Sequence, residues 1–206
     1  MKYLKMLGLA AILAMAFSAY LGAGSASAAV LCTTPKAPCG AGWDEVAGTI
    51  IEASLVGSAT LEDTSNKVLD TCTEGTDKWE VTATGGLNIP VGRRTIEITF
   101  GKCTGPAKAV ALGTEQDEYI EGTNDGTETD KGTEITITTA GSVSCIYGTG
   151  TGTDIGKWNG GESEEDALEV NAVLTKTGGS FLCATSAKWT ANFRITKPKN
   201  ISILAN

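Results

Sequence analysis

The stretch KWTANFRI, residues 188–195, alternates strictly between polar and apolar side chains. Its apolar members are Trp189, Ala191, Phe193 and Ile195. Successive side chains of a β-strand point to opposite faces, so this spacing places all four on one face. The stretch therefore predicts a half-buried strand.

The same period of two recurs along the chain, and glycine-rich turns separate the segments that carry it. Threonine is abundant in these segments, and its branched β-carbon packs well on a pleated surface. We therefore expect an all-β protein, an antiparallel β-sandwich for which a Greek key is one arrangement. The spacing is too irregular for a propeller or solenoid. The expected strands are 49–56, 59–62, 78–84, 95–100, 109–112, 118–121, 134–139, 143–147, 168–174 and 188–195.

The N-terminus has the three parts of an export signal. Two lysines precede an apolar run, Leu7–Leu21, and a small-residue pattern, Ala26-Ser27-Ala28, follows it. A membrane-spanning helix needs about 20 apolar residues, and this run is shorter and interrupted by glycine. We therefore predict a helical signal peptide over 1–28 and a single secreted domain over 29–206.

The cysteines all lie in the predicted secreted domain, and their number is even. In an exported chain this pattern favours three disulfides, for which fifteen connectivities exist. We predict sequential pairing, Cys32 with Cys39, Cys72 with Cys103, and Cys145 with Cys183. Lipid attachment at Cys32 is the alternative for the first of these, but it requires a small residue where this chain has Leu31.

The composition excludes several kinds of chemistry. The chain has 24 acidic and 16 basic residues, and loss of the signal would lower its net charge from −8 to −10. Such an acidic surface disfavours nucleic acid and anionic membranes. The chain has no histidine, which excludes His-dependent nucleophilic catalysis and His-ligated metals. No phosphate-loop, dinucleotide or C-x-x-C motif occurs either, so we expect no catalytic residue, cofactor or metal.

The four tryptophans divide into two pairs by their surroundings. Trp79 and Trp189 lie in alternating segments and are expected in the core. Trp43 and Trp158 lie among glycines, so they are the candidates for an exposed aromatic surface that binds a ligand.

An acidic segment runs from Glu115 to Glu134. Asp125, Glu128 and Asp130 lie among glycines, as a calcium loop requires, but their spacing does not match an EF-hand. We therefore expect a solvated hairpin tip here, with the turn at Asn124-Asp125-Gly126. The charged segment 160–169 is expected to be a similar loop that leads into a strand.

Four short segments resemble a set of secreted Thr/Gly-rich β-proteins of soil actinobacteria that are mainly described as hypothetical. These are the export segment beginning MKYLKMLGLAA, residues 31–40 with their cysteine pair, SCIYGTG at 144–150, and SFLCATSAKWTANF at 180–193. The resemblance implies export and a disulfide framework. It implies no activity and no site residues.

Three classes of function follow from these observations. The first is a non-catalytic secreted or cell-surface β-domain with a structural, adhesive or interaction role and an unidentified envelope or extracellular partner. The alternative is a carbohydrate- or small-ligand-binding module, which an exposed Trp43 or Trp158 would favour. A carboxylate-based hydrolase is the third and needs two facing acidic side chains in a pocket. In each class we expect no membrane insertion after the signal is removed.

Overall fold

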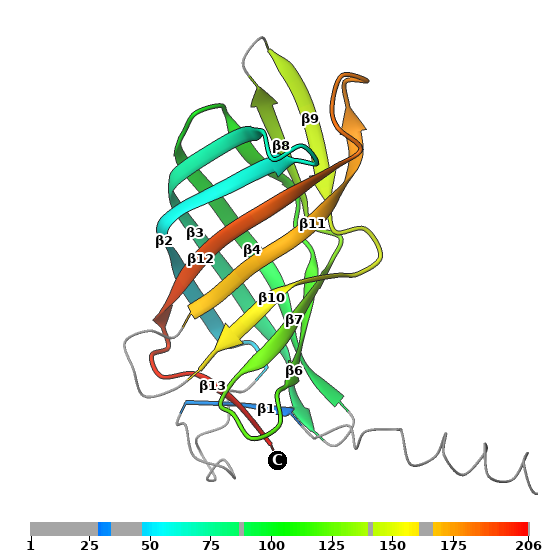
Figure 1. The fold of residues 1–206 in the computed structure, drawn as a ribbon. Helices are drawn as coiled ribbons and strands as arrows, with labels where there is room; N and C mark the ends of the chain where they lie inside the picture. The colour runs from blue at the N-terminus through cyan, green and yellow to red at the C-terminus, as the bar shows by residue number, and fades with distance from the viewer. Residues whose placement is uncertain (1–28, 34–46, 87–88, 140–141, 161–166, 206) are drawn as a thin grey trace, which may run out of the picture.

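The computed structural model describes residues 29–33, 47–86, 89–139, 142–160 and 167–205, and every regular element in these ranges is a β-strand (Figure 1). The predicted all-β class is therefore confirmed, whereas the predicted signal peptide lies outside the described residues. No helix in the described part of the chain has the length and hydropathy needed to cross a bilayer. The strands are β1 (Ala29–Cys32), β2 (Ile50–Asp63), β3 (Val68–Gly86), β4 (Ile89–Cys103), β5 (Ala107–Ala111), β6 (Thr114–Tyr119), β7 (Gly126–Lys131), β8 (Glu134–Thr139), β9 (Val143–Gly148), β10 (Thr153–Asn159), β11 (Ala167–Gly179), β12 (Ser186–Lys197) and β13 (Ser202–Ala205).

The strands form one antiparallel sheet that closes into a barrel. Eight strands make the closed ring, in the order β2, β3, β4, β6, β7, β10, β11 and β12, and β12 pairs again with β2. The expected β-sandwich and Greek key are therefore wrong. Alternation along a strand says only that one face is buried, and a sandwich and a barrel both meet that condition. Their difference lies in which strands pair at the edges, and here no edge of the ring is left open.

Three strands of the ring bend partway along their length. β5 and β6, β7 and β8, and β9 and β10 each follow one another with only two to four residues between them. In the orientation of Figure 1, β6, β7 and β10 lie in the lower half of the barrel and belong to the closed ring. The strands β5, β8 and β9 lie in the upper half, where they pair with one another and with the end of β11. Gly132, with φ of +87°, lies at the bend between β7 and β8, where a left-handed conformation favours glycine.

The lower end of the barrel is covered by the two ends of the described chain. β1 and β13 pair antiparallel, and β1 also pairs with the end of β3 (Figure 1). Leu31, Ile201 and Ile203 are fully buried beneath this cover and join the core. The lower end of the lumen is therefore sealed by apolar side chains.

Two disulfides fasten the upper half of the barrel. Cys72 lies directly opposite Cys103 in the ladder between β3 and β4, with 3.9 Å between their Cα atoms. Cys145 on β9 is bonded to Cys183, which lies in the connection between β11 and β12. Both predicted pairs are confirmed, and they agree with an oxidising extracellular environment.

Candidate functional site

The acidic segment forms a hairpin whose alternate side chains point into the barrel. In β6 the buried residues are Glu115 and Asp117, and in the paired strand β7 they are Glu128 and Asp130. The register places Asp117 opposite Glu128 and Glu115 opposite Asp130. The prediction of a solvated hairpin tip is therefore wrong for these four residues, because the period-two geometry of a strand turns every second one inward.

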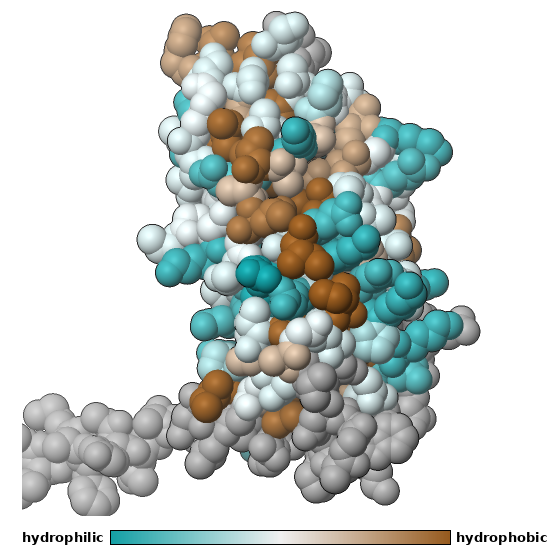
Figure 2. All heavy atoms as spheres, turned by 180° about the vertical axis from the view of Figure 1, so that it is seen from behind, coloured by the Kyte–Doolittle hydropathy of each residue, from teal (hydrophilic) through white to brown (hydrophobic). Residues whose placement is uncertain are grey.

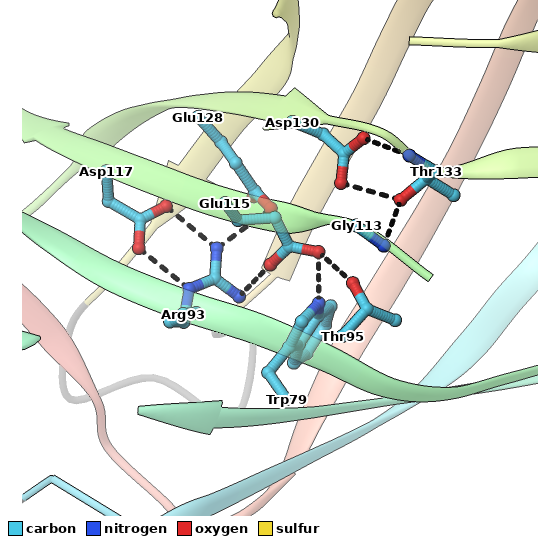
Figure 3. A network of polar contacts seen from close by, with 9 residues as sticks. All are labelled: Trp79, Arg93, Thr95, Gly113, Glu115, Asp117, Glu128, Asp130 and Thr133. Atoms are coloured by element: carbon cyan, nitrogen blue, oxygen red, sulfur yellow. Dashed lines mark hydrogen bonds and ion pairs between the residues drawn. The ribbon is translucent and has the colours of Figure 1, made fainter. Parts of the chain in front are cut away.

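A single arginine lies among these carboxylates (Figure 3). The Nε and Nη2 atoms of Arg93, on β4, each lie 2.7 Å from an oxygen of Asp117. Its Nη2 also lies 2.8 Å from Glu128 Oε1, and its Nη1 lies 3.1 Å from Glu115 Oε2. The guanidinium thus binds three acidic side chains, and its fork geometry allows the two-pronged contact with Asp117.

Two tryptophans enclose the guanidinium. Its central carbon lies 4.8 Å from the ring centre of Trp79 and 4.6 Å from that of Trp158, so both rings make cation–π contacts. Glu115 Oε1 accepts hydrogen bonds from Trp79 Nε1 at 2.7 Å and from Thr95 Oγ1 at 2.6 Å. Arg93 is therefore held by charge on its edges and by aromatic rings beside it.

Two further acidic side chains extend the cluster along the lumen. Asp130 accepts hydrogen bonds from the hydroxyls of Thr133 and Thr149. Asp77, on β3, is buried, and its Oδ1 has no hydrogen-bond partner among the described residues, as is also true of Glu128 Oε2. We name the six residues Arg93, Asp77, Glu115, Asp117, Glu128 and Asp130 the lumen cluster.

The pKa values of four carboxyl groups in the lumen cluster are raised, chiefly because these groups are buried. Burial raises the pKa of Glu115 to about 7, although Arg93 opposes the shift. Burial raises the pKa values of Asp77 and Glu128 well above their ordinary values, and it raises that of Asp130 against two threonine hydrogen bonds. Burial alone would lower the pKa of Arg93, but Asp117, Glu128 and Glu115 raise it. Burial thus favours the protonated forms of Asp77, Glu115, Glu128 and Asp130.

The space beside the lumen cluster has the size of water molecules. The cavity lined by Asp77, Glu115, Glu128 and Asp130 has a volume of about 20 Å³. A neighbouring apolar cavity, which shares Tyr147 and Trp189 with the first, gives about 30 Å³. One water molecule needs roughly 10–15 Å³ of such space. Glycoside hydrolysis needs a sugar between two carboxyl groups, and these cavities have no room for one.

The residues weighed for calcium do not come together. Glu128 and Asp130 point into the lumen, whereas Asp125 lies in the connection between β6 and β7 and accepts a hydrogen bond from the Gly160 amide. Among the described residues, one group of three side chains has metal-ligand geometry, Asp70 with Cys72 and Cys103. The two sulfur atoms of this group are bonded to each other, and Asp70 instead accepts hydrogen bonds from Thr71, Thr104 and Gly105.

The structure places three of the four tryptophans in the interior. Trp79 and Trp189 are buried, as expected. Trp158 is also fully buried, so the prediction that it forms an exposed ligand surface is wrong. It lies on β10 at a position that faces the lumen, where it contacts Arg93 and Trp79. Trp43 lies outside the described residues.

The predicted Cys32–Cys39 disulfide stays a prediction. Cys32 is buried in β1, and Cys39 lies outside the described residues.

The most exposed large apolar side chains are two neighbours at the upper end of the barrel. Phe181 is 90% exposed and Leu182 is 67% exposed, in the connection between β11 and β12. We name these two residues the apolar tip. Figure 2 shows hydrophobic side chains at the top of the visible face and also in a band down its middle.

The backbone around the apolar tip is fixed at several points. The Ser180 amide donates to Ser144 O at 2.9 Å, and Cys183 is tied to β9 by its disulfide. Lys176 Nζ donates to Ser180 O at 2.8 Å, and the Tyr147 hydroxyl donates to Ala184 O at 3.3 Å. The contacts flank the tip on both sides, so Phe181 and Leu182 are held in solvent by an ordered turn.

Sequence reasoning missed both of these features, although each leaves a signal. The lumen cluster appears as acidic residues at every second position in TEQDEY, residues 114–119, and in GTETDK, residues 126–131. The apolar tip appears as Phe-Leu next to a cysteine in a turn that is otherwise polar. Comparisons of the chain with protein-family models, with curated proteins and with solved structures found no match.

Proposed function

We propose that the protein is a secreted, non-catalytic interaction domain, a rigid barrel that presents the apolar tip to a partner in the cell envelope or outside the cell. The observation that carries this proposal is the 90% exposure of Phe181 on a turn fixed by the Cys145–Cys183 disulfide. Exposed apolar side chains held in one conformation lose little entropy on binding, and large ones dominate binding energies.

The interior supports a structural role for the lumen cluster. The guanidinium of Arg93 is engaged by carboxylates of the same chain, and β1 and β13 cover the lower end of the lumen. The adjoining cavities admit water but not a substrate. Function is therefore assigned to the outer surface.

A binding measurement with isolated cell envelopes tests the proposal. The wild-type protein and a variant with Phe181→Ser and Leu182→Ser are each incubated with envelopes of the producing cells, and the bound fraction is measured. The matched control is Val173→Thr, which removes an apolar side chain that is 62% exposed on β11 away from the tip. We expect the tip variant to bind at least fivefold less and the control to bind like wild type. Equal binding of the tip variant, or no binding by wild type, contradicts the proposal.

A second candidate function rests on a shallow depression on the barrel wall. It has a volume of about 440 Å³ and is lined by Thr73, Thr76 and Thr99 together with Glu74 and Phe100. Pockets of roughly 300–1,000 Å³ suit small ligands, and hydroxyl groups beside a carboxylate suit a sugar. A glycan array tests this candidate, with Glu74→Gln as the variant expected to lose binding, because the Glu74 side chain is exposed at this depression. Binding to no glycan, or unchanged binding by that variant, contradicts it.

A further inference from the structure

The described connections at the upper end of the barrel carry little charge. They are 64–67, 104–106, 142 and 180–185, and they contain one lysine and no acidic residue. The described residues of the lower connections, 120–125, 160 and 198–201, contain two acidic residues and one lysine. The connections around the apolar tip therefore add no negative charge of their own that would oppose its approach to an anionic surface.

The size of the apolar tip favours one kind of partner. Two side chains of this kind expose roughly 300 Å² of surface, whereas a stable protein interface buries about 800 Å² on each partner. The connection between β11 and β12, which carries the tip, lies at the upper end of the barrel (Figure 1). A lipid surface accepts projecting apolar side chains without a complementary pocket, because the acyl chains adapt to them.

We propose that the apolar tip inserts Phe181 and Leu182 into the boundary between headgroups and acyl chains of a lipid surface, with the lower end of the barrel facing away. This inference rests on the proposed function and names the chemistry of its partner. Lys176 lies directly beneath the tip, where it donates to Ser180 O, so a cation accompanies the apolar side chains. We thus depart from the expectation, drawn from the sequence, that the secreted domain does not insert into a membrane. The contact is shallow, and the barrel itself stays outside the lipid.

The binding is weak and reversible when one tip acts alone. A single short lipid anchor gives an association constant of roughly 10⁴ M⁻¹, and two side chains bury less apolar surface than such an anchor. The test therefore uses millimolar lipid. Vesicles of phosphatidylcholine, with and without phosphatidylglycerol, are mixed with wild type, with the variant Phe181→Ser plus Leu182→Ser, and with the Val173→Thr control.

We expect wild type and control to sediment with both kinds of vesicle and the tip variant to bind at least fivefold less, with unchanged melting temperatures for all three proteins. Equal sedimentation of wild type and tip variant, or none by either, overturns the inference.

The same experiment separates this inference from the proposed function. If wild type does not bind vesicles but binds envelopes through its tip, and protease treatment of the envelopes abolishes that binding, the partner is a protein. The lipid inference then fails while the proposed function stands. If wild type binds neither vesicles nor envelopes, both fail.

Discussion

Arg93 and Asp117 form a two-pronged ion pair in which neither side chain has any exposed surface. The two N–O distances are both 2.7 Å. Taking two charges out of water is costly, and the attraction between them offsets this cost only where the geometry is good and the remaining donors are satisfied. Glu115 and Glu128 also form ion pairs with the guanidinium of Arg93, so the pair is part of a connected network.

Removal of Arg93 is expected to be strongly destabilising. In Arg93→Met, three buried carboxyl groups lose their cation, and breaking a buried ion pair from one side costs about 3–5 kcal/mol. The matched control is Arg94→Met, because Arg94 is the next residue and makes an exposed ion pair with Glu80. That change should cost less than about 1 kcal/mol. Urea unfolding at pH 7 measures both, and equal losses would contradict a structural role for the lumen cluster.

The protein is expected to become less stable as the pH rises from about 4.5 to about 7. The pKa of Glu115 is about 7 in the folded protein against an ordinary value of 4.5. Between these values the unfolded chain releases this proton and the folded protein keeps it, so the free energy of unfolding falls with increasing pH. The full effect of this group is about 3 kcal/mol. The pKa values of Asp77 and Glu128 shift in the same direction.

Urea unfolding at pH 5 and pH 8 measures this dependence. Glu115→Gln should reduce the difference between the two conditions, because it removes the titrating group. Glu118→Gln is the control, since Glu118 lies on the same strand but faces solvent, and it should leave the difference unchanged. A stability that increases from pH 5 to pH 8 would refute the assigned protonation of the cluster.

Much of the strand content could be predicted from the sequence, but the closure of the sheet could not. Alternation located the strands that contain Trp189 and Ile98, because these strands have one apolar face. It missed β7, where the inward residues are glutamate and aspartate, and it placed β6 at 118–121 rather than at Thr114–Tyr119. A rule that assigns polar residues to the outside must fail where an arginine neutralises them inside.

The Cys145–Cys183 disulfide is expected to stabilise both the fold and the apolar tip. Its loop spans 38 residues, and a disulfide of this kind contributes about 2–4 kcal/mol. Cys145→Ser with Cys183→Ser should therefore lower the melting temperature by roughly 5–15 °C. The same variant should bind envelopes more weakly than wild type at a temperature where it remains folded. Wild-type binding by the folded variant would show that the tip does not need to be fixed.

The cover at the lower end depends on the absence of a side chain at Gly85. Its φ is +91°, and a Cβ atom there would lie 1.8 Å from Ala29 O, so Gly85→Ala must displace β1. Gly57→Ala is the control, because Gly57 has a similar φ of +75° but open space around it. We expect the control to cost about 1 kcal/mol, from backbone strain alone, and Gly85→Ala to cost clearly more. Equal losses in urea unfolding would mean that β1 is not held against β3.

The candidate site was less predictable than the fold, for a physical reason. Burial of Trp158 depends on Arg93, which lies 65 residues away in the sequence and meets it only when the barrel closes. The exposure of Phe181 is equally invisible in the sequence, because an apolar residue beside a cysteine is usually expected to be buried with it. In this fold the disulfide holds the backbone while the neighbouring side chain points into solvent.

Hydrogen exchange of the bound protein tests most directly whether the apolar tip, rather than the barrel interior, makes the functional contact. The protein is measured by mass spectrometry free and in the presence of envelopes or vesicles. We expect slower exchange in residues 180–185 on binding, and unchanged exchange in strands β4, β6 and β7, which carry the lumen cluster. Protection within those strands, with no change at the tip, would contradict an outward-facing interaction domain and return the function to the lumen.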